Sequence, residues 1–427
     1  MTVLEFQSNR HPTIGVEIEL GLVDRQSMNL SNSFPRLVEL LPDGGGERFK
    51  PEIIQSVLEI NTDICESVKD ADRELRGRIA VVEAAADQLG LSLWWGGVHP
   101  FARCGDQQYT SDERYLGLVE QLQDLARRMV TLGLHVHVGV DSGDKAVMIC
   151  DRILRHLPTL LALSSSSPYW EGQATGLQSY RSKVMEVLPT AGLPPLMRNW
   201  SEYVWLVNHM VDTGFIGTIR EIWWDVRPHH NFGTVEVRMC DMPGNLEDTL
   251  ALSALIQCLV KALSDEIDHG AYQHDCHPMM VRQNKWRAAR FGMQAEFVDP
   301  ITYEVKSAGQ VVVDLVERLQ PIAEELGCSE YLTRCREMAA GPTWADRQIF
   351  VAAEAGSLPE MVRRLTAQSR VTTPSLQSDD HASSITNQEP PQNQSIHSID
   401  PTPSAVSSVA GSISTQVSRE RATTPVL

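Results

Sequence analysis

The chain has 427 residues, 42% of them hydrophobic and 22% charged, so it can bury a large core as one domain or two. Its formal net charge of -18 argues against nucleic acid or an anionic membrane surface as a partner, because both would repel it at long range. Eight cysteines without a CxxC pair, a start without a signal-peptide pattern and no apolar window of membrane-spanning length lead us to expect a cytoplasmic protein.

The first two predicted elements are strands, Gly15–Leu20 and Val57–Thr62, in which polar and aliphatic residues alternate. Successive side chains on a strand point to opposite faces. Glu17 and Glu19 therefore share the polar face of the first strand, and Glu59 lies on the polar face of the second.

A helix is predicted next at Val68–Leu89, where apolar residues recur at spacings of three, four and seven and Gly90 supplies a C-terminal cap. Leu91–Phe101 is a further strand candidate. The same helical periodicity recurs four times, at Asp112–Leu132, Lys145–Leu163, Leu246–Ile267 and Gln310–Leu326.

Two more strands lie between these helices, and each carries a polar pair on one face. They are Leu134–Val140, with His135 and His137, and Thr234–Met239, with Glu236 and Arg238. If all four polar-faced strands join one sheet with their aliphatic side on the core, the other side gathers four carboxylates, two imidazoles and a guanidinium. Strands alternating with long helices predict an α/β or α+β protein.

The composition changes from about Ala367 to Ser, Thr, Gln, Asn and Pro with few large aliphatic residues. Such a segment cannot bury enough apolar surface to offset its ordering entropy. We therefore predict one domain over residues 1–366 and a disordered polar tail over residues 367–427.

The clustered polar residues indicate magnesium-assisted phosphoryl transfer. Mg²⁺ takes oxygen ligands and bridges the phosphates of ATP, and an arginine beside a metal carboxylate can bind phosphate through two hydrogen bonds. His135 and His137 leave a second class open, a metal-dependent amidohydrolase in which neutral imidazoles bind zinc or iron. Because Glu outnumbers His and no third histidine has ligand spacing, magnesium is favoured.

At these residues the sequence resembles the glutamate-cysteine ligase type 2 family, and within it the carboxylate-amine ligase subfamily. Four matching segments contain the predicted strands: GVEIELGLVD (15–24), EIIQSVLEINT (52–62), GLHVHVGV (133–140) and TVEVRMCD (234–241). Other matches are GGVHPFA (96–102), ALSSSSPYWEGQATGLQSYRS (162–182), WDVRP (224–228) and NKWRAARFG (284–292). Together the matches cover roughly residues 12 to 300 in the family's order.

The resemblance implies an α+β, glutamine-synthetase-like fold, with a curved, mainly antiparallel sheet, helices on one face and the active site on the other. It implies that ATP phosphorylates a carboxylate, in the family's type reaction the γ-carboxylate of L-glutamate. The amine of a second substrate, typically L-cysteine, then attacks the acyl phosphate. A ligase of this fold with a different amine or carboxylate stays open, as does a non-catalytic binding protein, although the retained carboxylates and Arg238 argue against the latter.

With the resemblance, roles can be assigned to the site residues. Six are assigned as ligands of Mg²⁺, with Mn²⁺ as an alternative: Glu17, Glu19, Glu52, Glu59, His135 and Glu236. Arg238 is the expected catalytic residue and contacts the transferred phosphate of ATP. Substrate binding is assigned to Arg181, His99, His137 and Arg227. The expected partners are amino acids and ATP, with no nucleic acid and no membrane, and a homodimer stays open.

Three residues of the NKWRAARFG segment keep two interpretations. Trp286, Arg287 and Arg290 lie on one predicted helix, where ion pairing at the surface and a role in the site are equally compatible with the sequence.

Overall fold

The structure is a computed structural model that describes residues 4–270 and 277–372. In these residues, seven strands pair into one sheet in the order β10-β11-β5-β1-β3-β2, and β4 also pairs with β1. Every pairing within this sheet is antiparallel. The strands are β1 (Ile14–Asp24), β2 (Phe49–Pro51), β3 (Val57–Asn61), β4 (Leu91–Trp94), β5 (Gly133–Gly139), β10 (Val226–His229) and β11 (Thr234–Asp241).

The register of these strands puts the predicted polar residues on one face. Glu17 of β1 lies opposite His135 of β5 on one side and opposite Asn61 of β3 on the other. The other opposed pairs are Glu19 with Glu59 and Glu236 with His137. Because directly opposed residues point to the same side of a sheet, the common polar face is confirmed.

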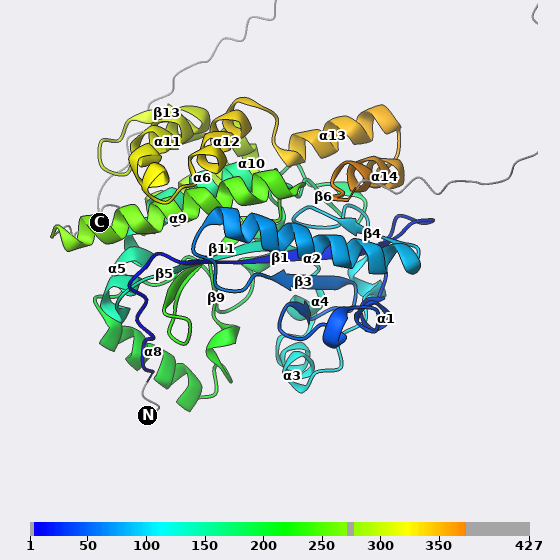
Figure 1. The fold of residues 1–427 in the computed structure, drawn as a ribbon, viewed down its shortest axis with the longest axis horizontal. Helices are drawn as coiled ribbons and strands as arrows, with labels where there is room; N and C mark the ends of the chain where they lie inside the picture. Colours follow the sequence, from blue (N-terminus) through cyan, green and yellow to red (C-terminus); the bar gives the residue numbers. More distant parts are fainter. Residues whose placement is uncertain (1–3, 271–276, 373–427) are drawn as a thin grey trace, which may run out of the picture. The chain divides into compact units, whose positions relative to one another are not determined.

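The other face of the sheet is covered by helices, as Figure 1 shows for α2 and α9. The helices in contact with it are α2 (Val68–Gln88), α5 (Gly143–Ile153), α6 (Leu157–Ser164) and α9 (Leu246–Asp268). A second layer packs on α6 and α9 and consists of α10 (Pro278–Phe291), α11 (Ala308–Glu325) and α12 (Ser329–Ala340). The chain continues through α13 (Trp344–Ala355) and α14 (Leu358–Gln368).

Shorter elements surround the polar face, and Figure 1 shows α3 and α8 on the side of the sheet away from α2 and α9. These helices are α1 (Phe34–Val38), α3 (Glu113–Leu122), α4 (Asp124–Arg127), α7 (Arg181–Met185) and α8 (Trp200–Asp212). Three strand pairs are separate from the main sheet: β6 (Tyr169–Trp170) with β7 (Gln173–Ala174), β8 (Ala191–Gly192) with β9 (Trp223–Trp224), and β12 (Glu296–Val298) with β13 (Val305–Ser307). Among the described helices, none combines the length and apolar character that a membrane span needs.

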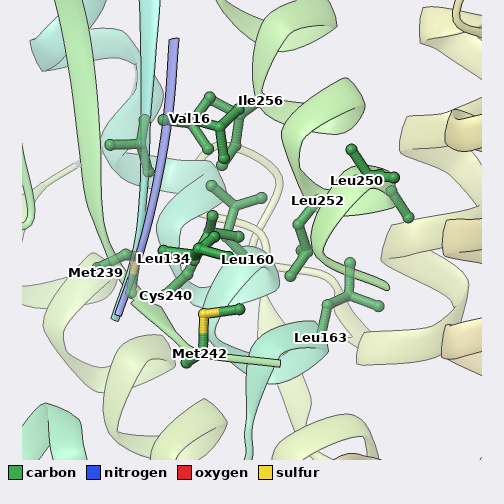
Figure 2. Close-up of a cluster of buried hydrophobic side chains, with 14 of the residues drawn as sticks. Val16, Leu134, Leu160, Leu163, Met239, Cys240, Met242, Leu250, Leu252 and Ile256 are labelled. Carbon is green, nitrogen blue, oxygen red and sulfur yellow. The ribbon is translucent and has the colours of Figure 1, made fainter. Parts of the chain in front are cut away.

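The core lies between the sheet and its helical layer (Figure 2). Val16 of β1 and Leu134 of β5 pack in one cluster with Leu160 of α6 and Ile256 of α9, and all four are almost fully buried. Burying one such side chain contributes about 1.5–3 kcal/mol relative to leaving it exposed. The aliphatic half of each strand thus fixes the backbone from which the polar half projects.

Two predicted helices are interrupted in the structure. The helix predicted at Asp112–Leu132 divides into α3 and α4 at Gln123, whose φ of 50° is incompatible with a continuous right-handed helix, and it ends at Arg127. The helix predicted at Lys145–Leu163 becomes α5 and α6, separated by a short 3-10 turn. Pro158 in the first turn of α6 has no N–H to continue the helix from α5, which explains this break.

Contacts to the domain continue beyond the predicted boundary at residue 366. Helix α14 runs to Gln368, and the backbone N–H groups of Val371 and Thr372 each donate to the buried carboxylate of Glu83 on α2 at 2.9 Å. The boundary therefore moves to Thr372 or later. The disorder predicted for the rest of the tail stays a prediction, because residues 373–427 lie outside the described residues.

Candidate active site

The polar face of the sheet lines a cavity of about 450 Å³. Ten of the eleven residues predicted for the site line it: Glu17, Glu19, Glu52, Glu59, His135, His137, Arg181, Arg227, Glu236 and Arg238. They come from β1, β3, β5, β10 and β11, from the segment before β3, and from the start of α7. Residues up to 221 positions apart in sequence thus converge on one space, since β1 holds Glu17 and β11 holds Arg238.

Glu17 is the centre of the cluster. Its Oε2 lies 3.2 Å from Nδ1 of His135, and its Oε1 lies 3.4 Å from Nε2 of His137. The same Nε2 of His137 is 3.6 Å from Oε1 of Glu236, so His137 connects a carboxylate of β1 with one of β11, the two strands that flank β5.

These side chains form three overlapping groups whose potential ligand atoms lie within 4.8 Å of one another. The groups are Glu17, Glu59 and His135; Glu17, His137 and Glu236; and Glu19, Glu52 and Glu59. In addition, Nε2 of His137 is buried and has no hydrogen-bond partner among the described residues. An orphaned imidazole nitrogen among carboxylate oxygens fits the donor set of a hard divalent cation with one nitrogen ligand.

Burial and neighbouring charges shift the pKa values of the clustered carboxylates in different directions. Burial and the nearby charges of Glu17 and Glu52 raise the pKa of Glu59 well above its ordinary value. Burial and the charge of Glu19 raise the pKa of Glu52 to about 7. Burial acts in the same direction on Glu17, but the hydrogen bond with His135 and the nearby imidazole of His137 hold its pKa well below the ordinary value. A bound cation would relieve the repulsion among these carboxylates.

Two arginines hold Glu236 in its charged form. Arg227 donates from Nε to Oε2 of Glu236 at 2.6 Å, and Arg238 forms an ion pair with Oε1. Burial alone would raise the pKa of Glu236, but Arg227 and Arg238 hold it well below the ordinary value. Nη1 of Arg227 also donates to the carbonyl oxygens of Ile219 and Ile222, at 2.9 and 2.7 Å, so Arg227 is anchored to the backbone and orients Glu236.

Arg181 reaches the cavity past a glycine. Its guanidinium is buried and donates from Nη1 to the carbonyl oxygen of Met239 at 3.2 Å. A Cβ atom on Gly133, the first residue of β5, would collide with this guanidinium. The glycine that opens the GLHVHVGV segment therefore makes room for the arginine of the distant SYRS segment.

A buried aspartate that the sequence analysis missed organises the serine-rich segment. Asp241, at the end of β11, accepts hydrogen bonds from the hydroxyls of Ser167 and Ser179 at 2.6 and 2.8 Å and from the N–H of Ser166 at 3.1 Å. Ser167 Oγ in turn accepts from the N–H of Arg181 at 3.1 Å. Two of the four consecutive serines, Ser166 and Ser167, thus bind a carboxylate that fixes the start of α7.

A buried lysine is the second residue near the cavity that the sequence did not predict. In α10, Lys285 is almost fully buried, and its Nζ lies 2.5 Å from Asp225 Oδ2 and 2.8 Å from Glu186 Oε1. Asp225 lines the cavity, so α10 supports its wall. Trp286, one of the residues singled out in the sequence, is instead 45% exposed and does not line the cavity.

Two basic residues complete the cavity at the β2 edge of the sheet. Lys50 Nζ lies 3.4 Å from Glu47 Oε2 and 4.0 Å from Glu59 Oε1. Arg114, at the start of α3, lines the same end and lies over the ring of Tyr115, 4.3 Å from its centroid. Arg114 and Tyr115 are among the residues that resemble the family, and Lys50 lies two residues before the matched segment 52–62, but the sequence assigned no role to Arg114 or Lys50.

The structure does not bring His99 to this cavity, which corrects its assignment to substrate binding. His99 is buried behind β4, where Nε2 lies 3.0 Å from the carbonyl oxygen of Met28 and Nδ1 accepts from the N–H of Ala102 at 3.0 Å. Burial lowers its pKa to about 3, so it is neutral at pH 7. Its hydrogen bonds hold the loop after β4 in place.

Comparison with known proteins gives a family match over most of the chain. The model of a family described as glutamate-cysteine ligase family 2 (GCS2) matches residues 13–364. A relative named "Putative glutamate--cysteine ligase 2" from Gloeobacter violaceus is 42% identical over 366 residues, which cover 85% of this chain and 98% of the relative. A relative of the same name from Thermobifida fusca is 38% identical over 377 residues, which cover 87% and 94%.

Two solved structures share the fold. A glutamate-cysteine ligase from Francisella tularensis in complex with AMP aligns with a TM-score of 0.64 at 14% identity, covering 86% of this chain and 90% of that chain. A bifunctional glutathione synthetase from Pasteurella multocida aligns with a TM-score of 0.61 at 15% identity, covering 84% and 51%. These likenesses confirm the predicted α+β fold class, with a mainly antiparallel sheet between a helical layer and a polar cavity.

Proposed function

Because the chain belongs to the glutamate-cysteine ligase family 2, we propose that it is an ATP-dependent carboxylate-amine ligase that forms an amide through an acyl phosphate. The proposed reaction joins L-glutamate and L-cysteine, with ADP and phosphate as the other products. The observation that supports it most is that five glutamates, which form three potential cation-binding groups with two histidines, line one cavity together with Arg181 and Arg238.

The donor set fits Mg²⁺, with Mn²⁺ as an alternative. The residues that would hold it are Glu17, Glu19, Glu52, Glu59, His135 and Glu236, and the orphaned Nε2 leads us to add His137. The cation would neutralise phosphate charge and orient the terminal phosphoryl group. Each of the three groups contains at least two carboxylates and at most one histidine, which favours a hard cation over the zinc of an amidohydrolase.

Arg238 and Arg181 are each assigned a different anionic group of the substrates. Arg238, beside the charged Glu236, offers a planar guanidinium for the transferred phosphate. Arg181, held by the backbone of β11 and by Ser167, offers a second guanidinium for a carboxylate of the amino-acid substrate. Since phosphate is a good leaving group when the amine attacks the acyl phosphate, the protein mainly positions the reactants and stabilises charge, and no covalent nucleophile is required.

A coupled assay tests this function. The purified full-length protein should release ADP only when ATP, Mg²⁺, a carboxylate substrate and an amine are all present, and mass spectrometry should find the matching amide. EDTA should abolish the activity, while a zinc-selective chelator should not. Zinc bound by His135 and His137, with an amide-hydrolysing activity that follows the zinc content, would contradict the proposal.

A further inference from the structure

Two aromatic rings stand at the β10 edge of the cavity. Phe232, in the turn between β10 and β11, stacks on His229 with ring centroids 4.2 Å apart and planes 13° apart. Each ring also meets His137 edge to face at 5.5 Å. Phe232 lines the cavity and is nevertheless 56% exposed, so much of its ring is open to a bound molecule.

The turn that carries Phe232 is held by the N-terminal segment. Asn9 Nδ2 donates to the carbonyl oxygens of Phe232 and Gly233 at 2.7 and 2.9 Å, and the N–H of Gln7 donates to the carbonyl of His230 at 2.9 Å. Gly233 has φ +63°, and a Cβ atom there would overlap the carbonyl oxygen of Gln7. The exposed ring therefore stands on a fixed backbone, which lowers the entropy cost of stacking a ligand against it.

The two ends of the cavity differ in chemistry. In the sheet order, β10 and β11 lie at one edge and β2 at the other. The β2 end carries Lys50, Arg114 and Glu52, which suit the ammonium and carboxylate groups of amino acids. The β10 end offers the flat ring of Phe232 next to His137, whose Nε2 belongs to one of the cation-binding groups. A molecule with a polyphosphate and a flat base matches this second arrangement.

Resting on the proposed use of ATP, we propose that Phe232, backed by His229, stacks against the nucleobase. The triphosphate then extends from this ring over β11 and β5 toward Arg238 and Glu17. The amino-acid substrates occupy the side of the carboxylate cluster away from Phe232, between Arg181 and the β2 end. Asn231, which also lines the cavity beside Phe232, is placed to offer its amide to the edge of the base.

Calorimetric titration of the full-length protein tests this assignment with two probes, Mg-ADP and Mg-tripolyphosphate. Phe232→Ala should bind ADP roughly tenfold or more weakly, the effect expected when an aromatic partner of a base is removed. It should bind tripolyphosphate, which has no base, as the wild type does. Phe232→Trp should keep the affinity for ADP. Phe215→Ala is the matched control, because Phe215 is 70% exposed and does not line the cavity.

The outcomes separate this inference from the proposed function. If the wild type binds neither probe, both are overturned. If Phe232→Ala binds ADP like the wild type, or loses affinity for both probes equally, the stacking site is overturned and the ligase proposal stands. If the same variant changes only the KM for the amine or the carboxylate, the ring belongs to the amino-acid end instead.

Discussion

The two faces of strand β1 have the same backbone and opposite tasks. Val16 and Ile18 are almost fully buried against the helical layer, where their side chains belong to one cluster of buried hydrophobic residues. Glu17 and Glu19 point into the cavity, where carboxylates crowd together and an imidazole nitrogen lacks a partner among the described residues. The difference shows how one strand can carry mutually repelling carboxylates on one face. Burial of apolar side chains on the other face supplies the stability that keeps the strand in place.

The largest expected effect comes from neutralising the centre of the polar face. Glu17→Gln removes a charge that belongs to two of the three cation-binding groups, so turnover should fall about 100-fold or more. Its Tm should stay close to that of the wild type, because the weakened contacts with His135 and His137 are offset by weaker repulsion with Glu59. Steady-state kinetics and calorimetry measure the two quantities.

The neighbouring core position is the matched control. Ile18→Ala leaves a cavity in the closed face and should lower the free energy of unfolding by about 2–5 kcal/mol, while the folded fraction keeps its turnover. A strongly destabilised Glu17→Gln, or an Ile18→Ala that folds well but is inactive, would mean that the two faces do not have separate tasks.

An intermediate effect is expected at Arg238. Arg238→Lys keeps the positive charge beside Glu236 but loses the planar fork, so turnover should fall at least about tenfold without loss of fold. Arg198→Lys is the control, because Arg198 is exposed on the surface in an ion pair with Glu202. Near-normal turnover in the Arg238 variant would remove this residue from the proposed mechanism.

The sequence predicted the floor of the cavity, which the strands of the main sheet form, better than its walls, which the surrounding segments form. Alternation within a strand is a local signal, so the shared faces of Glu17 with Glu19 and of His135 with His137 could be deduced before any pairing was known. The family resemblance then placed Glu52 and Arg181, which now line the cavity.

The walls depend on contacts between distant segments, and these leave no periodic signal. Asp241 looks like the polar end of a strand until the serines of another segment close around it, and Lys285 looks like one of several charges on α10. For His99 the error was the opposite one. Its motif suggested the site, whereas its imidazole bonds the backbone of Met28, after β1, and of Ala102, in the loop after β4. Pro158 could have predicted the break between α5 and α6, but the apolar periodicity continues across it and favoured a single helix.

The smallest effect, and the one that tests the corrected boundary, concerns the end of the domain. A variant ending at Thr366 loses Val371 and Thr372 and leaves the buried carboxylate of Glu83 without these two N–H donors, which should cost about 1–3 kcal/mol of stability. A variant ending at Thr372 should keep the full Tm. Both should keep the turnover of the full chain, because the proposed site residues all precede residue 240. A Tm for the longer variant that falls as far as that of the shorter one would show that residues 373–427 also stabilise the domain, against the disorder that their composition predicts.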